Sequence, residues 1–470
     1  MQLLLEVEDF KIRAYFLWIE QGRPVGSPLG LSAGGIMGRY CLYSLLAVWL
    51  SVGGVISHIE AANPEPALSV ALIAHSGYPP KDYEQITKFF SEISGIPVNV
   101  NYILYEKQLD EIYKSASLAT PAYDVVAVDA LWVPDLVSKG ALLPVDDFIK
   151  GFKNDIVPTA LKAFALDEKI WAVPHLSNFQ LLFYNKALLA EAGFEKPPAT
   201  LEEMVSQMKV LKIRGAVEYP WHDAWGVGMG LIDEYTWLVG AFGDTLFSPS
   251  GEPIFNKGAG LEALRFMIQL LDDRLINPSS LTSGVLETKD EFITGNCVFN
   301  TNWVFQAALA KDASLSKVST AAEVGLLPVA RKVLQKKQYE FNSASVGAFQ
   351  GLAIVANTSN PKRAWSYIRF LTSPLVQKAF LQEMPVWNSL QTDATLKKID
   401  TLLEIKRNEM LSVLPLPNIR NYGTISSMIE KSLMAALKKE VEPEVALNQA
   451  VEEIKAKGIS MVIIPSSSSK

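Results

Sequence analysis

The chain has 470 residues, of which 49% are hydrophobic and 20% are charged. This length predicts two or three domains, and this composition supports a large buried core, which excludes a largely disordered chain. The net charge is -7 and no cluster of lysines and arginines occurs, which argues against nucleic acid or an anionic membrane surface as a partner. The sequence has two cysteines and neither a CxxC nor an HExxH motif, so we expect no metal site and no cofactor.

An apolar run over residues 42–56 is the first feature along the chain. It is shorter than the roughly 20 residues of a membrane-spanning helix, but it has the length of a signal-peptide core. Arg39 precedes it, and two alanines follow near a plausible cleavage site. We interpret 37–62 as a signal peptide that starts at Met37, and 1–36 as a mis-assigned extension. The protein is then exported to the periplasm or the cell exterior; a retained membrane anchor is the alternative.

From residue 68 onward, predicted strands and helices alternate. The apolar run 68–74 is typical of a buried strand, and 83–93 carries apolar residues on one helical face. Further strands are predicted at 98–103 and 123–129, with a polar helix between them. This strand–helix order favours an α/β fold in which helices cover a parallel sheet.

Four side chains fall just after predicted strands: Tyr78, Glu106, Asp129 and Trp132. In open α/β sheets, ligands bind beyond the carboxyl ends of the strands, so we expect these four residues on one rim. For Asp129 the alternative is the capping of a helix N-terminus, because aspartate favours that position.

Eight of the ten tryptophans follow the predicted signal peptide. Five of them fall in or near predicted loops or element ends: Trp132, Trp225, Trp237, Trp303 and Trp387. An indole offers a flat apolar face and one N–H donor, which suits the apolar face and hydroxyl rim of a sugar ring. Packing in the core is the alternative for each of them. After the predicted signal peptide, no GxSxG elbow, Walker loop or GxGxxG after a strand occurs, which argues against an enzyme.

Four stretches of the sequence carry a resemblance to a known family. They are YDVVAVDALWVPDLVSKGALLPVDDFI (123–149), KIWAVPHLSNFQLLFYNKALLAEAGFEKPPATLEEM (169–204), FITGNCVFNTNW (292–303) and SVGAFQGLAIVANTSNPKRAWSYIRFLTSPLVQKAF (345–380). In this order they resemble the family 1 extracellular solute-binding proteins, the group that includes maltose-binding protein. Each motif is loose by itself, but together they extend the resemblance over about residues 68 to 457.

The resemblance implies the two-lobed periplasmic-binding-protein fold of type II, in which the chain crosses three times between two α/β lobes. We expect these crossings near 174–180, 345–351 and 414–421. The lobes would then comprise 66–176 with 350–413, and 177–349 with 414–463, followed by a disordered tail at 464–470. Ligand would bind between the lobes, which close about the hinge.

The resemblance also implies a set of ligand-binding residues. Asp129 and Trp132 would come from the first lobe, and Asn302 and Trp303 from the second. The crossings and the loop near 387 would add Gly347, Phe349, Trp387, Arg420 and Tyr422, whereas Tyr78, Glu106, Trp225 and Trp237 rest on their placement alone. The implied function is capture of a sugar or polyol by a monomer, for delivery to the membrane permease of an ABC importer. A non-sugar solute, such as a sugar phosphate or an amine, is the alternative, and an enzyme is a more remote one.

Overall fold

The computed structural model describes residues 66–74, 78–228, 230–379, 383–415, 417 and 419–457. The predicted extension (1–36), signal peptide (37–62) and tail (464–470) lie outside these residues. The chain divides into two compact units, Met1–Leu68 with Thr87–Asn99, and Ser69–Ile86 with Val100–Lys470. In the first, the backbone N–H of Leu68 donates to the Pro97 carbonyl at 2.8 Å. No helix among the described residues is long and apolar enough to cross a membrane.

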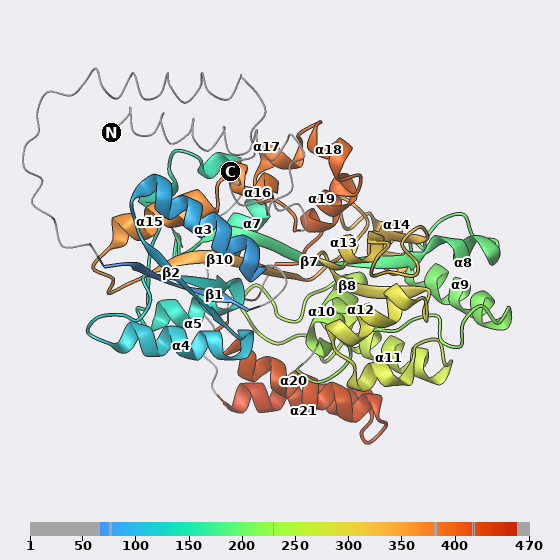
Figure 1. Ribbon diagram of the computed structural model, residues 1–470. Helices are drawn as coiled ribbons and strands as arrows, with labels where there is room; N and C mark the ends of the chain where they lie inside the picture. Colours follow the sequence, from blue (N-terminus) through green and yellow to red (C-terminus); the bar gives the residue numbers. More distant parts are fainter. Residues whose placement is uncertain are drawn as a thin grey trace, which may run out of the picture. The chain divides into compact units, whose positions relative to one another are not determined.

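Helices and strands alternate through the first part of the chain, as the sequence predicted, and helices dominate the last part (Figure 1). The strands are β1 (Leu68–Ile73), β2 (Val98–Ile103), β3 (Val125–Asp129), β4 (Leu142–Leu143), β5 (Ala165–Leu166), β6 (Lys169–Ile170), β7 (Val173–Asn185), β8 (Phe299–Trp303), β9 (Ala322–Gly325) and β10 (Gly347–Val355). The α-helices are α3 (Pro80–Ser94), α4 (Tyr105–Ser117), α5 (Val133–Ser138), α6 (Asp146–Ile149), α7 (Pro158–Ala163), α8 (Lys186–Glu191), α9 (Leu201–Ile213), α10 (Leu231–Ala241), α11 (Ala259–Asp272), α12 (Val285–Thr294), α13 (Gln306–Lys311), α14 (Arg331–Lys336), α15 (Pro361–Leu371), α16 (Pro374–Ala379), α17 (Asn388–Gln391), α18 (Leu396–Ile399), α19 (Leu403–Leu411), α20 (Tyr422–Leu437) and α21 (Pro443–Ala456). Three short 3₁₀ helices are η1 (Ala130–Trp132), η2 (Lys153–Asp155) and η3 (Pro278–Thr282).

The largest sheet in the described chain is mixed, with the strand order β2-β1-β3-β10-β7-β8. Strands β1 and β3 are parallel, as the strand–helix alternation predicted. Strand β10 lies between β3 and β7 and is antiparallel to both. Local sequence patterns did not predict this arrangement, because β10 follows β3 by more than 200 residues and its pairing is therefore entirely non-local.

Strand β7 is the longest strand, with 13 residues, and nearly all of them are buried. Its first half pairs with β10, and its second half pairs with β8 and β9 (Figure 1). Beside it, the backbone N–H of Ser345 donates to the Ser412 carbonyl at 3.0 Å, and that of Leu414 donates to the Ser345 carbonyl at 2.9 Å. Residues from all three predicted crossings therefore meet through backbone hydrogen bonds. The lobe boundaries themselves remain a prediction.

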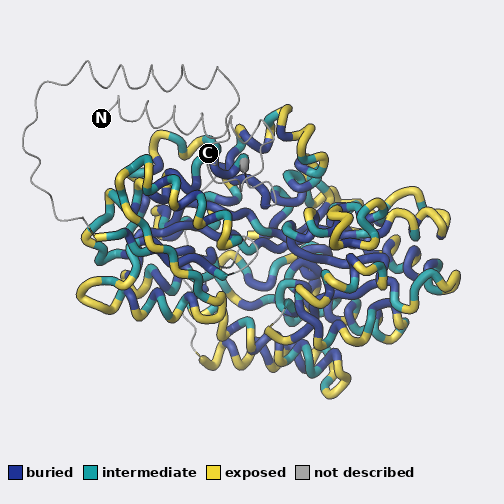
Figure 2. Tube along the Cα trace, in the orientation of Figure 1, coloured by how far each residue is buried: buried dark blue, intermediate teal, exposed yellow. Residues whose placement is uncertain are grey.

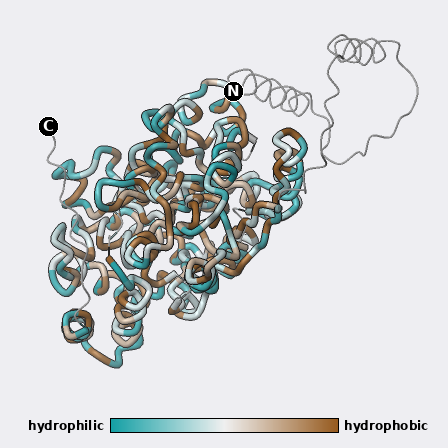
Figure 3. The backbone as a smooth tube through the Cα atoms, turned by 90° about the vertical axis from the view of Figure 1, so that its left-hand side faces the viewer, coloured by the Kyte–Doolittle hydropathy of each residue, from teal (hydrophilic) through white to brown (hydrophobic). Residues whose placement is uncertain are grey.

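A second feature is the hydrophobic core built around α10, α11, β8, α20 and α21. In Figure 2 the tube along β7 and β8 is almost continuously dark blue, the colour of buried residues. Hydrophobic and hydrophilic stretches are interspersed along the tube in Figure 3, as expected for helices with one buried face. Trp221 lies within this core, with its ring centroid 6.5 Å from that of Trp225 and 6.3 Å from that of Trp237.

Gly260, near the start of α11, tests how tightly this core is packed. A Cβ atom at this position would lie 2.0 Å from the Phe255 carbonyl oxygen, which is backbone and cannot move aside easily. We predict that Gly260→Ala lowers the free energy of unfolding by about 1–3 kcal/mol, the usual cost of overpacking. Urea denaturation measures this change in the free energy of unfolding. Gly151→Ala is the control, since a Cβ there meets nothing within 4 Å, and an equal loss in both variants would contradict the prediction.

Candidate functional site

Asp129 is the last residue of β3 and the N-cap of η1. Its Oδ1 atom accepts a hydrogen bond from the backbone N–H of Leu131 at 2.9 Å, so the capping alternative is correct. Its Oδ2 atom accepts one from the Tyr105 hydroxyl at 3.2 Å, so the same carboxyl also faces another segment of the chain. Burial raises the pKa of Asp129 to about 6, and the two hydrogen bonds partly oppose that shift because they stabilise the ionised form.

An aromatic pair stands beside this carboxyl. Tyr105 is the first residue of α4, and Trp132 ends η1. Their ring centroids are 4.9 Å apart at an interplanar angle of 44°. The Tyr105 side chain is 38% exposed and Trp132 is half-buried, so both retain surface that a ligand could cover.

Two further side chains from distant segments interact electrostatically with Asp129. Asp233 is in the first turn of α10, and Tyr422 is the first residue of α20. Burial raises the pKa of Asp233 to about 8, with further increases from the charges of Glu234, Glu430 and Asp129. Burial raises the pKa of Tyr422 well above its ordinary value, with smaller increases from the charges of Asp233, Glu430 and Asp129. We call Asp129, Tyr105, Trp132, Asp233 and Tyr422 the Asp129 site.

Hydrogen bonds from backbone N–H groups to two carboxylates hold the starts of α10 and α20 in place. The Asp135 carboxylate on α5 accepts the backbone N–H of Asn421 at 2.9 and 3.0 Å, which joins α5 to the start of α20. The Glu430 carboxylate on α20 accepts the N–H groups of Gly228 and Ile232 at 3.1 and 3.3 Å. These N–H groups lie at the start of α10, where helices favour an anion.

Strands β3, β10 and β7 connect the Asp129 site to the predicted crossings. Asp129 is the register partner of Gln350 on β10, and Gln350 is the partner of Leu176 on β7. Two positions further along β7, Asn178 pairs with Ala348, and its Oδ1 atom is buried without a hydrogen-bond partner among the described residues. A buried amide oxygen of this kind is a candidate acceptor for a ligand hydroxyl.

Gly347 and Phe349 lie on β10 at the predicted second crossing, where space is tight. A Cβ at Gly347 would come within 2.8 Å of Val413 and 2.9 Å of the Phe349 ring. Phe349 is 1% exposed, so its side chain belongs to the packing between the crossings. These two residues therefore hold the crossing segments close together.

The structure places Trp225 and Trp237 inside the core, with no exposed surface, so it does not bring them to the Asp129 site. The Trp237 indole N–H donates to Glu234 Oε2 at 2.6 Å. The competing interpretation of these two tryptophans as core residues agrees with their positions. The sequence did not reveal this, because the segment around Trp225 folds into the core and Trp237 lies on the buried face of α10.

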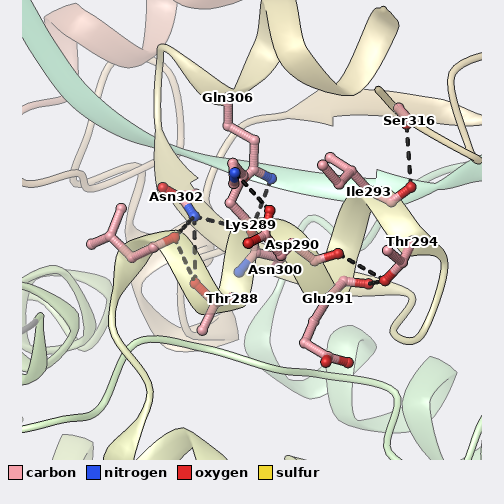
Figure 4. A network of polar contacts seen from close by, with 11 residues as sticks. Thr288, Lys289, Asp290, Glu291, Ile293, Thr294, Asn300, Asn302, Gln306 and Ser316 are labelled. Carbon is pink, nitrogen blue, oxygen red and sulfur yellow. Dashed lines mark hydrogen bonds and ion pairs between the residues drawn. The ribbon is translucent and has the colours of Figure 1, made fainter. Parts of the chain in front are cut away.

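Asn302 and Trp303 lie at the end of β8, away from the contacts described for Asp129. Figure 4 shows the Asn302 amide inside a network that includes Thr288, Asn300 and Gln306. Its nitrogen donates to the Val285 carbonyl at 3.1 Å, and its oxygen accepts the backbone N–H of Trp303 at 2.8 Å. Asn302 therefore holds the turn after β8, and Trp303 is 8% exposed against the core.

The four remaining predicted residues are dispersed. Trp387 is buried, and its indole N–H donates to the Thr372 carbonyl at 2.9 Å, so it belongs to the packing near α15. Glu106 is exposed in the first turn of α4, next to Tyr105. Arg420 is half-buried, two residues before Tyr422. Tyr78 is fully buried, and its ring is stacked on that of His175 at 5.6 Å.

The ring of Tyr78 lies near a small cavity, which has room for about one water molecule. His175, Gln377 and Glu383 contribute to its lining, together with Tyr83. The Tyr83 hydroxyl and His175 Nε2 are 2.8 Å apart, whereas His175 Nδ1 and Glu383 Oε2 are buried without a partner among the described residues. Burial raises the pKa of Glu383 to about 7 and lowers that of His175 to about 3, so the imidazole is uncharged near neutral pH, where the carboxyl is partly protonated.

Three candidate residues were missed by sequence reasoning: Tyr105, Asp233 and Asn178. Tyr105 lies two residues after the end of β2, and the rule that selected Glu106 would have found it with an offset of one residue. Asp233 starts a helix that the sequence analysis did not locate. Asn178 lies within the predicted first crossing, but its residue type carried no signal of its own. No group of histidines, cysteines and carboxylates among the described residues is arranged to hold a metal ion.

Comparison with known proteins decides the family. The model of the bacterial extracellular solute-binding proteins matches residues 76–378 of this chain. The chain belongs to this family. The resemblance to solute-binding proteins that the sequence indicated is therefore confirmed, and this is a family of solute-binding proteins rather than of enzymes.

Individual members of the solute-binding family are distant in sequence. A binding protein of Brucella abortus is 22% identical over 298 residues, which are 62% of this chain and 68% of that protein. The structure of maltose-bound T. maritima MalE3 has a TM-score of 0.74 at 21% identity and covers 83% of this chain and 100% of its own. A ribitol complex from Agrobacterium radiobacter K84 has a TM-score of 0.72 at 21% identity, with 84% and 99% coverage. These matches confirm the predicted fold class, the α/β fold of the two-lobed binding proteins.

The hydrogen bond between Tyr105 and Asp129 gives a direct test of the site's geometry. The phenol stabilises the ionised carboxylate, so we predict that Tyr105→Phe raises the pKa of Asp129 further above about 6. Carbon-13 NMR of the aspartate carboxyls, titrated from pH 3 to pH 9, measures this pKa. Tyr113→Phe on the same helix is the control, since the hydrogen bond of Asp129 comes from Tyr105. An unchanged or lowered Asp129 pKa in Tyr105→Phe would show that the bond does not form in solution.

Proposed function

We propose that the protein is an exported receptor that captures a sugar or a polyol at the Asp129 site and delivers it to the permease of an ABC importer. The observation that carries the proposal is a buried carboxylate beside two partly exposed aromatic rings in a solute-binding protein. The maltose and ribitol complexes with the same fold support this class of ligand. The proposed leader at 37–62 supports export, and the same arguments favour a receptor without enzymatic activity.

Hydroxyl-rich ligands suit the chemistry of this site. An ionised carboxylate accepts short, charge-assisted hydrogen bonds from hydroxyl groups, and Asp129 has lone pairs left after its two contacts. The faces of Tyr105 and Trp132 can cover the apolar C–H groups of the ligand. The buried Asn178 oxygen offers one further acceptor.

Capture follows from closure of the proposed lobes, 66–176 with 350–413 and 177–349 with 414–463. Asp129, Tyr105 and Trp132 belong to the first, and Asp233 and Tyr422 belong to the second. A ligand that contacts both sets gains more interactions in the closed form than in the open form, so it shifts the population toward closure. The closed form would then bind the permease. Micromolar affinity requires about 8 kcal/mol, which a few such contacts can supply.

The charges at the site disfavour a sugar phosphate as the ligand and favour an amine. Carboxyl groups are the charged groups that raise the pKa of Asp233. A sugar phosphate would place its anion among them, which is unfavourable. An amine would be attracted by the same carboxyls, so a cationic solute is the second candidate. Its affinity would fall steeply with added salt, whereas that of a neutral polyol would not.

A thermal-shift panel tests the ligand class. The panel contains maltose, ribitol, mannitol, glucose 6-phosphate and spermidine, each at 1 mM. A ligand with a dissociation constant of about 10 μM adds about 2.7 kcal/mol to the stability of the folded state, so it raises the melting temperature. We predict a shift with at least one neutral sugar or polyol and none with the phosphate ester. A shift with spermidine alone would favour the amine, and a shift with glucose 6-phosphate alone would contradict the proposal.

Replacement of the central carboxyl tests the site itself. Asp129→Ala removes the acceptor for the ligand hydroxyls, and a hydrogen bond to a charged group contributes about 1.5–3 kcal/mol. We therefore predict that calorimetric affinity for the best solute of the panel falls by about 10-fold to 150-fold. Asp147→Ala is the control, because this carboxylate is exposed and pairs with Lys150 at the surface. If the two variants bind the solute with equal affinity, Asp129 does not contribute to the binding site.

A further inference from the structure

Two carboxylic side chains, Asp223 and Glu234, lie together in the core and share a hydrogen-bond partner. Asp223 follows the segment that contains Trp221, and Glu234 is next to Asp233 on α10. Both side chains are completely buried, with 0% of their surface exposed. The Thr301 hydroxyl on β8 is hydrogen-bonded to Asp223 Oδ2 and, at 2.7 Å, to Glu234 Oε2.

The number of available protons constrains this arrangement. A threonine hydroxyl has one proton, so it can donate to only one of the two carboxyls. The other carboxyl must then donate to the hydroxyl oxygen, and it can do so only when it is protonated. Glu234 accepts bonds from Gln180 Nε2 and Trp237 Nε1, both at 2.6 Å, and it has two oxygens for three donors when Thr301 is included. Asp223 in turn accepts the backbone N–H groups of Ala224 and Thr301, so the hydrogen bonds require one proton on the pair as a whole.

From this geometry we infer that Asp223 and Glu234 share one proton through Thr301, and that this protonated pair positions α10 for the candidate binding site. Through Glu234 the pair connects α10 to Gln180 on β7 and to Thr301 on β8. Loss of the proton would leave two carboxylates in contact inside the core, which is strongly unfavourable. The start of α10, where Asp233 lies, would then move away from β7 and β8. The positioning role rests on the proposed function, whereas the shared proton does not.

The surroundings of the pair agree with a retained proton. Burial raises the pKa of both carboxyls, that of Asp223 to about 7, and the charge of Asp223 raises the pKa of Glu234 further. Asp233 on α10 and Cys297 before β8 are the other titratable groups coupled to the pair, and neither is a cation. The adjacent His222 ring is bonded to the Ser283 and Ser279 hydroxyls at 3.1 and 3.2 Å. Burial lowers the pKa of His222, so its ring stays neutral near pH 7.

The linkage between protonation and folding gives the sign of the pH effect. In the unfolded chain Asp223 ionises near pH 4, whereas in the folded protein it holds its proton to about pH 7. Its contribution to stability is therefore complete below about pH 4 and is lost as the pH rises through about 7. Over that interval the folding equilibrium constant falls by up to about tenfold for each pH unit.

The decisive comparison is between Asp223→Asn and Glu234→Gln, each in the full chain. An amide at 223 donates permanently to Thr301, so we expect the stability of Asp223→Asn in urea to rise relative to the wild type from pH 5 to pH 7. The difference should approach tenfold in the equilibrium constant per pH unit. Glu234→Gln places an amide N–H against the donors of Gln180 and Trp237. The stability of this variant should therefore be lower than that of the wild type at every pH tested. Asp147→Asn, at an exposed carboxyl, should show no such trend.

Positioning has a separate readout that requires no ligand. Hydrogen–deuterium exchange of peptides covering 231–241 should be at least threefold faster in the wild type than in Asp223→Asn at pH 8, and equal in the two at pH 5.5. Comparison at the same pH cancels the intrinsic exchange rates. If the difference in stability does not change with pH, the shared proton is refuted, and equal exchange at pH 8 refutes the positioning role. If Asp223→Asn does not fold, the carbon-13 titration of the Asp223 carboxyl in the wild type decides, and a pKa near 4 would overturn the inference. Both results remain valid if no solute of the panel binds.

Discussion

The antiparallel pairing of β10 with both β3 and β7 is the constraint on which the candidate site depends. It sets Asp129, Gln350 and Leu176 side by side on three neighbouring strands, although more than 200 residues separate the first two along the chain. Because β7 continues past β10 to pair with β8 and β9, the same strand connects the surroundings of Asp129 to those of α10. The position of each polar group near Asp129 therefore depends on the register of a non-local sheet.

Electrostatics gives the site its chemical character. Asp129, Asp233 and Glu430 come from β3, α10 and α20, and their charges act on one another or on Tyr422. Such a group of carboxyls disfavours an anionic ligand and favours hydroxyl donors or a cation. Asp223 and Glu234 are fully buried, and Glu234 is next to Asp233 on α10. Carboxyl groups thus serve both as acceptors at the site and as internal connections for the helix that carries Asp233.

The sequence predicted much of the fold because local patterns carry it. The apolar runs at β1 and β3, and the amphipathic pattern of α3, are readable from spacing alone. Asp129 and Trp132 were found because the carboxyl end of a strand is a recognisable position. Thr200 caps α9, with its hydroxyl accepting the N–H of Glu203 at 3.1 Å. By contrast, Trp225 and Trp237 look the same in the sequence whether they face a ligand or a core. Asp233 and Asn178 become candidates only once α10 and β7 have been placed against β3.

The most direct test is a crystal structure of the protein with the neutral solute that gives the largest thermal shift. The account predicts a ligand hydroxyl within 2.5–3.2 Å of the Asp129 carboxylate and an apolar ligand face against Trp132 or Tyr105. A ligand seated instead against Trp303 and Asn302, or in the cavity near His175 and Glu383, with Asp129 untouched, would contradict it.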